Sequence, residues 1–124
     1  MKTRIRGLSL WVHKNEAVLV SRADDPRCAA EIVLLKTKPV SKEATVEVRP
    51  GGDPEAMRIL GAKPGPQTVT LTAATAVEVL PGLLMGIGIP DEAPSITFQG
   101  ARLVFKDPPH LWHIQRETFL QKKL

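Results

Sequence analysis

Eleven prolines and nine glycines are spread along the 124 residues, and they divide the chain into short segments. Strands of a few residues fit between such breakers, whereas most helices need longer uninterrupted runs. Several of the segments alternate apolar and polar residues, which is the period of a half-buried strand. The sequence therefore predicts a mainly β fold, either an antiparallel β-sandwich or a small β-barrel, with one short helix.

The length suits a single β domain over residues 1–124, because two separate cores would be cramped in it. Hydrophobic residues make up 43% of the chain and charged residues 24%, as in globular rather than disordered proteins. The apolar runs are too short and too broken to cross a bilayer, and no secretory signal follows the basic N-terminus, so we expect no membrane insertion. The single cysteine, Cys28, excludes an intrachain disulfide and a cysteine-based zinc site, and it fits a reducing compartment such as the cytoplasm.

The first half of the chain contains several strand patterns. Residues 4–12 and 17–21 predict a hairpin, with Gly7 at a β-bulge where the alternation slips by one residue. Residues 31–36 are apolar on both faces, which favours a strand in the centre of a sheet. Residues 45–49 alternate cleanly and predict a further strand.

The clearest helix signal follows Gly51 and Gly52. Asp53 is a good N-cap, Pro54 suits the first helical position, and Gly61 can end the helix in a left-handed conformation. The predicted helix has about two turns, so we expect it to depend on packing against something larger.

The second half of the chain contains further strand patterns. Residues 68–71 alternate, and residues 96–98 and 102–105 flank Gln99–Gly100, which predicts a hairpin with a two-residue turn. Two segments fit either a strand or a helix on sequence alone, namely residues 73–80 and residues 110–124.

Residue spacings typical of catalytic or metal sites are weak in this chain. His110 and His113 would share one face of a helix but not of a strand, and no spaced third ligand accompanies them. Asp91 and Glu92 lie in a proline-flanked loop, where solvation is the default for carboxylates. We therefore expect no metal and no cofactor, and we do not favour an enzyme. A hydrolytic enzyme with an acid and histidine site is the third interpretation.

The charged residues near Cys28 and the cysteine itself are better explained by structural roles than by catalysis. Asp24 and Asp25 are flanked by Arg22 and Arg27, which predicts a surface ion network rather than a pair of catalytic carboxylates. Cys28 has no adjacent histidine, so we expect a buried structural thiol.

The basic excess lies in the first half of the chain, where residues 1–63 carry twelve Lys or Arg against eight Asp or Glu. The cations alternate with acids and tyrosine is absent, so a solvated surface is the simpler interpretation. A small RNA- or nucleic-acid-binding regulator is the alternative function, with Arg22, Arg27 and Arg116 as the candidate contacts.

The segments Leu19–Arg22 and Gln115–Phe119 resemble parts of the first and last strands in the carbon storage regulator family of small RNA-binding dimers. In that family the corresponding arginines contact RNA, so the resemblance implies such a role for Arg22 and Arg116. The similar segments cover under a tenth of the chain. Members of that family are much shorter, so a large insertion would separate the two segments.

No Lys or Arg lies between Lys63 and Arg102, and the segment from Val79 to Pro90 contains no charged residue at all. This segment is also more apolar than one loop requires. We expect a shaped loop or a short edge strand here, and an edge strand without a lysine invites pairing with another chain. The main prediction is therefore a non-enzymatic binding or assembly module that acts through protein–protein contacts and self-associates. The expected interface residues are Leu83, Leu84, Met85, Ile87 and Ile89.

Overall fold

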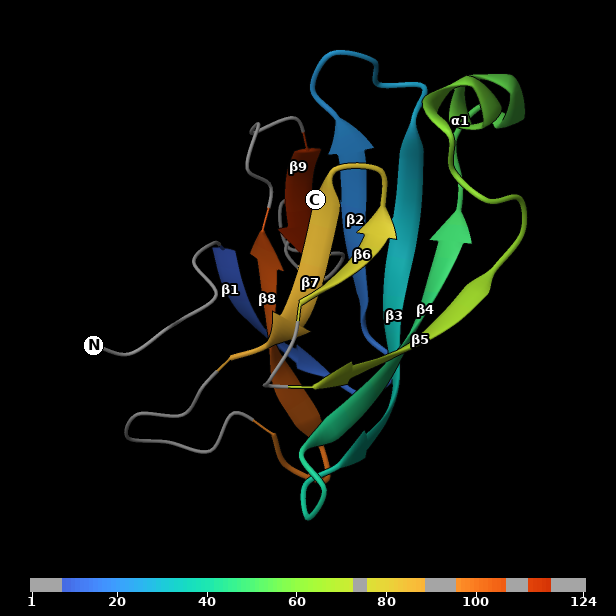
Figure 1. Ribbon diagram of the computed structural model, residues 1–124. Coiled ribbons are helices and arrows are strands. Elements are labelled where there is room, and N and C mark those ends of the chain that lie inside the picture. The colour runs from blue at the N-terminus through green and yellow to red at the C-terminus, as the bar shows by residue number, and fades with distance from the viewer. Residues whose placement is uncertain (1–7, 73–75, 89–95, 107–111, 117–124) are drawn as a thin grey trace.

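The computed structural model describes residues 8–72, 76–88, 96–106 and 112–116 (Figure 1). Within these residues the chain forms two antiparallel sheets that face each other, with one short helix beside the larger sheet. The predicted β-sandwich is confirmed, and the described strands do not close into a barrel.

The smaller sheet has four strands in the order β1-β8-β7-β6, and the larger has five in the order β5-β4-β3-β2-β9. The strands of the smaller sheet are β1 (Leu8–His13), β6 (Val77–Leu80), β7 (Leu83–Ile87) and β8 (Gly100–Lys106). The strands of the larger sheet are β2 (Ala17–Arg22), β3 (Ala29–Lys38), β4 (Glu43–Pro50), β5 (Gln67–Thr72) and β9 (Trp112–Arg116). Both segments that fitted either a strand or a helix are strands where the structure describes them, as β6 and β9.

The hairpin predicted between the first two strands is wrong. β1 pairs along its whole length with β8, whereas β2 pairs with β3 and β9. The turn between β1 and β2 carries the chain from one sheet to the other. Asn15 in this turn adopts a φ of 69°, and its N–H donates to the Leu34 carbonyl oxygen on β3 at 2.7 Å. Alternation specifies which face of a strand is buried but not which strand lies beside it. The bulge predicted at Gly7 lies outside the described residues.

The hairpin predicted around Gln99–Gly100 forms only in part. β8 begins at Gly100, but the chain before it contributes a single bridge between Ile96 and Ala101 instead of a strand. The Thr97 hydroxyl oxygen accepts hydrogen bonds from the backbone N–H groups of Gln99 and Gly100, each at 3.2 Å. These side-chain bonds satisfy the turn without a second strand.

The core lies between the facing sides of the two sheets. Alternate residues along the strands point inward, and β3, between β2 and β4, is the central strand that its apolar run predicts. Burial of each large apolar side chain contributes about 1.5–3 kcal/mol of transfer free energy. The largest fully buried side chains are Val12, Leu83, Met85, Ile87, Leu103 and Phe105 from the smaller sheet, and Val18, Val20, Ile32, Leu34, Val46 and Leu71 from the larger.

β3 contains an irregularity near its end. Its pairing with β4 shifts register between Leu34 and Lys36, so Leu35 is an extra residue in the strand. The shift brings Thr37 opposite the buried Ala44. The Thr37 hydroxyl oxygen is buried and has no hydrogen-bond partner among the described residues.

Helix α1 (Pro54–Leu60) forms where the sequence predicts it. The Asp53 carboxylate accepts a hydrogen bond from the Ala56 N–H at 3.2 Å, and Gly61 ends the helix with a φ of 99°. Ala56 and Met57 pack into the core, which stabilises a helix too short to persist alone. No helix among the described residues is long and apolar enough to cross a membrane.

Candidate functional site

Strand β5 is an edge strand without the usual protection. Edge strands present unpaired backbone N–H and C=O groups, and proteins commonly guard them with charges, prolines or distortions. Of the other described edges, β1 ends in His13, β6 is short and irregular and contains Glu78, and β9 contains His113 and Arg116. β5 pairs regularly with β4 over six residues and is the one described edge strand that has no ionisable side chain. It is therefore the edge best suited to pairing with another chain.

A cleft of about 280 Å³ opens beside β5, between the edges of the two sheets. β5, the end of β4, the loop after α1, and β6 with its following turn line this cleft. Val69 and Val79 contribute apolar side chains, and Gln67 and Glu78 contribute polar ones. The exposed Glu78 carboxylate accepts a hydrogen bond from the Gly82 N–H at 3.3 Å. The cleft thus leaves part of β5 accessible and presents its acidic group to solvent.

The segment predicted as an interface lies inside the smaller sheet. β7 pairs with β6 on one side and with β8 on the other, so the expectation of a loop or an edge strand is wrong. Leu83, Met85 and Ile87 are completely buried in the core, which accounts for the apolar composition of the segment. Leu84 is half-buried on the outer face of the sheet, and Ile89 lies outside the described residues. Contact between a partner and Leu84 stays a prediction.

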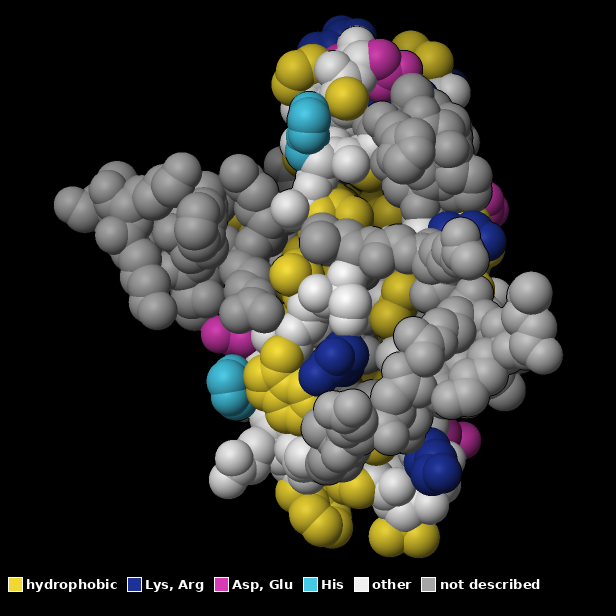
Figure 2. All heavy atoms as spheres, turned by 90° about the vertical axis from the view of Figure 1, so that its left-hand side faces the viewer, with side chains coloured by type: hydrophobic (Ala, Val, Ile, Leu, Met, Phe, Trp, Pro, Cys, Tyr) yellow, Lys and Arg dark blue, Asp and Glu magenta, His cyan; other side chains and the backbone are white. Residues whose placement is uncertain are grey.

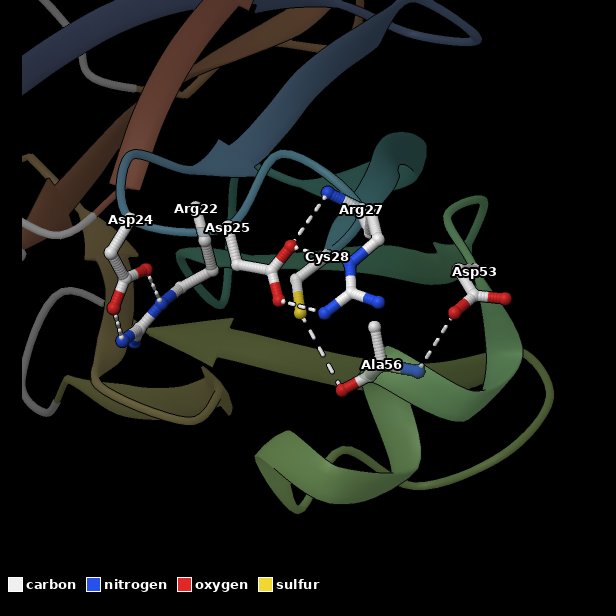
Figure 3. Close-up of polar contacts among 7 residues, drawn as sticks. All are labelled: Arg22, Asp24, Asp25, Arg27, Cys28, Asp53 and Ala56. Atoms are coloured by element: carbon white, nitrogen blue, oxygen red, sulfur yellow. Dashed lines mark hydrogen bonds and ion pairs between the residues drawn. The ribbon is translucent and has the colours of Figure 1, made fainter.

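The loop between β2 and β3 holds two arginine–aspartate pairs (Figure 3). The Nε and Nη2 groups of Arg22 donate to the two carboxylate oxygens of Asp24, both at 2.8 Å. Arg27 binds Asp25 in the same way, with both distances 2.9 Å. These hydrogen bonds hold the pKa of Asp24 and that of Asp25 below their ordinary value. The structure thus shows the predicted surface ion network, in which each carboxylate is stabilised in its ionised form.

The structure does not bring the three candidate nucleic-acid contacts together. The guanidinium carbon of Arg22 lies 5.6 Å from the ring centre of Trp112, and the Arg22 side chain is only 12% exposed. Arg27 is exposed, but a carboxylate in the same loop balances its charge. Arg116 on β9 lies opposite Val18, near the start of β2, whereas Arg22 lies at the end of that strand. Arg22 and Arg27 are therefore engaged by carboxylates of their own loop, and a nucleic-acid contact by the three arginines stays a prediction.

Cys28 is buried between this loop and the helix. Its thiol donates to the carbonyl oxygen of Ala56 at 3.5 Å (Figure 3). Burial, with a smaller contribution from Asp25, raises the pKa of the Cys28 thiol. Cys28 is therefore the buried structural thiol that the sequence predicts.

The histidines do not form a site in the described part of the chain. His13 and His113 are both exposed and belong to different sheets. His110, Asp91 and Glu92 lie outside the described residues, so the expectations that His110 and His113 hold no metal and that Asp91 and Glu92 are solvated stay predictions. Among the residues that the structure describes, no three His, Cys, Asp or Glu side chains are grouped as a metal site would need.

The described parts of the two segments that resemble the carbon storage regulator family lie on adjacent strands, with Leu19 on β2 opposite Gln115 on β9. No protein-family model matches the chain, and comparison with curated proteins and with solved structures found no match. The resemblance is thus limited to these two short segments.

Proposed function

We propose that this domain is a non-enzymatic assembly module and that two copies join through their β5 strands. One observation carries the proposal, namely that β5 is a regular edge strand without ionisable side chains and with an open cleft beside it. An unpaired edge of this kind gains backbone hydrogen bonds when another strand is added to it. Pairing two such edges would extend the larger sheet continuously from one copy into the other.

The sequence of β5 is self-complementary when the strand pairs antiparallel with a copy of itself about Thr70. Directly opposite residues in an antiparallel pair lie on the same face of the sheet. With the twofold axis at Thr70, Thr68 lies opposite Thr72 of the partner subunit, and Val69 lies opposite Leu71 of the partner subunit. Every threonine then faces a threonine, and each apolar residue faces an apolar one. Such cross-strand pairs stabilise antiparallel sheets.

The absence of charge on β5 favours a second copy over an unrelated peptide. β5 offers no ionisable group that would select an acidic or a basic partner strand, so selectivity has to come from register and shape. A twofold pairing uses both edges at once, and the assembly therefore closes at two copies.

Cysteine cross-linking tests this register. Thr70 lies beside its own copy in the proposed pair, so Thr70→Cys should give a disulfide-linked dimer under mild oxidation. Thr45→Cys is the matched control, because Thr45 lies opposite Thr70 on β4 but in the interior of the sheet. Cys28 is buried and should not contribute. Cross-linking of Thr70→Cys no faster than of Thr45→Cys would contradict the proposed register.

Sedimentation of the whole chain tests the assembly itself. The wild type should sediment as a dimer, whereas Thr70→Lys should be monomeric with an unchanged circular dichroism spectrum, because two like charges would meet at the axis. Mixing Thr70→Lys with Thr70→Glu should restore a dimer. A wild type that stays monomeric at high micromolar concentration would overturn the proposed function.

A further inference from the structure

One end of the sandwich carries two large hydrophobic side chains that the described chain leaves uncovered. Val40, in the connection between β3 and β4, is 93% exposed, and Phe98, in the turn before β8, is 73% exposed. Both connections lie at the lower end of the molecule in Figure 1, and Figure 2 shows hydrophobic side chains projecting at that end. Packing within the described fold therefore does not explain why hydrophobic residues occupy these two positions.

Backbone hydrogen bonds link the turn between β1 and β2 both to the turn that carries Phe98 and to β3, the strand that leads into the connection with Val40. The Lys14 N–H donates to the Gln99 carbonyl oxygen at 2.9 Å, which ties the turn that carries Phe98 to the β1–β2 turn. The Asn15 N–H in turn binds the Leu34 carbonyl oxygen on β3, which runs on into the other connection. The two connections with the exposed tips thus lie at the same end of the sandwich, on either side of the β1–β2 turn in this set of contacts.

The same end carries an excess of positive charge. Glu16 and Glu43 are its acidic residues among residues 14–16, 36–43 and 96–99, and both are half-buried. Four exposed lysines lie in these segments, and no ion pair joins them to another described residue: Lys14, Lys36, Lys38 and Lys42.

We propose that this end of the domain docks on an anionic lipid membrane, with Val40 and Phe98 in the interfacial region and the lysines facing the headgroups. Apolar side chains beside lysines supply the two attractions that hold peripheral proteins on anionic bilayers, namely apolar burial and charge complementarity. Nucleic-acid surfaces commonly combine several stacking rings with arginine forks, whereas these segments contain one aromatic ring, that of Phe98, and no arginine. Such docking is shallow and needs no segment that crosses the bilayer.

Cosedimentation of the full chain with lipid vesicles tests the proposal. The wild type should bind vesicles of phosphatidylcholine with about a third phosphatidylserine, and binding should weaken with added salt and on pure phosphatidylcholine. Replacing both tips, as Val40→Ser with Phe98→Ser, should weaken binding about tenfold or more. Lys38→Gln and Lys42→Gln should each weaken it about fivefold.

Ile59→Ser is the matched control. Ile59 is 72% exposed on α1, at the opposite end of the molecule from the two tips, so this change should leave vesicle binding unaltered (Figure 1). Circular dichroism confirms that each variant is folded. Equal binding by the wild type and the double-tip variant, equal binding to neutral and anionic vesicles, or binding to single-stranded nucleic acid without binding to vesicles would each overturn the proposal. Dimerisation through β5 is measured without lipid, so either proposal can fail while the other stands.

Discussion

The indole nitrogen of Trp112, in the larger sheet, donates a hydrogen bond to the carbonyl oxygen of Pro81, in a turn of the smaller sheet, across 3.0 Å. Trp112 lies on β9 of the larger sheet and is 6% exposed, whereas Pro81 begins the turn between β6 and β7 of the smaller one. The Arg22 guanidinium lies over the same indole ring. This contact joins the two sheets at one end of the sandwich by a directional bond as well as by apolar packing.

We expect Trp112→Phe to lower the free energy of unfolding by about 1–2 kcal/mol, because it removes the bond to Pro81 and part of the buried ring. Trp11→Phe is the control, since Trp11 is only partly buried on β1, and its effect should stay below about 1 kcal/mol. Urea denaturation followed by circular dichroism measures both changes. Equal losses for the two variants would show that the bond between the sheets contributes nothing.

The adjacent glycines before α1 should respond differently to alanine. A Cβ atom on Gly52 would lie 2.0 Å from the Arg27 carbonyl oxygen and 2.7 Å from the Ala29 nitrogen, both backbone atoms that cannot move aside cheaply. A Cβ atom on Gly51 would meet nothing within 4 Å. We expect Gly52→Ala to destabilise the domain by about 2–3 kcal/mol and Gly51→Ala to change it by less than about 0.5 kcal/mol. Thermal unfolding distinguishes them, and similar midpoints would contradict the close approach at Gly52.

Thr37→Val should leave the domain as stable as the wild type or more stable by about 1 kcal/mol, because the buried hydroxyl oxygen has no partner to lose. Thr37→Ser provides the contrast, since it keeps the hydroxyl and removes a methyl group. We expect Thr37→Ser to be the less stable of the two in chemical denaturation. A loss of stability in Thr37→Val would mean that this hydroxyl has a hydrogen-bond partner in solution.

The two aspartates of the β2–β3 loop should contribute to stability at neutral pH and lose that contribution in acid. Hydrogen bonds from Arg22 and Arg27 lower the folded-state pKa of Asp24 and Asp25 below the ordinary value of 3.8. The contribution is therefore complete above that value and disappears as the pH falls through the lowered folded-state pKa. Both groups are at the surface, so the effect should be small and weaken with salt.

A variant with Asp24→Asn and Asp25→Asn should show a flatter dependence of unfolding free energy on pH in the acid range than the wild type. Glu47→Gln serves as a comparison, because Glu47 pairs with Arg49 outside this loop. If the unfolding free energy of the wild type and of the double variant fell in the same way with pH in the acid range, the loop pairs would not stabilise the folded state.

Local sequence chemistry was sufficient to predict the parts of this fold that depend on local interactions. Asp53 and Gly61 bracket α1 because capping depends on a few adjacent residues. The apolar run of β3 indicates a central strand because burial on both faces leaves no polar side. Cys28 is buried, as expected for an isolated cysteine that is followed by two alanines.

The sheet partners could not be predicted in the same way. Nothing in β1 specifies that it pairs with β8, because alternation encodes faces and not neighbours. For the same reason β7, in the segment predicted as a loop or a short edge strand, has a neighbour on each side. β5, predicted only as a strand, lies at the edge. The sequence around Val40 also gives no sign that this side chain forms an exposed hydrophobic tip, since the neighbouring proline and lysines indicate only a polar connection.

The crossing of the chain between sheets after His13 has a consequence for the order in which the domain is built. β2, β3, β4 and β5 follow one another in sequence and are neighbours in the larger sheet, so each can pair as soon as its predecessor has been made. β1 leaves the ribosome before these four strands, yet its partner β8 is synthesised after all of them. β1 therefore waits unpaired while the meander beside it forms, and the smaller sheet closes only after β8 has been made. Long-range closures of this kind slow folding, so the union of β1 with β8 should limit the rate at which the domain reaches its native state.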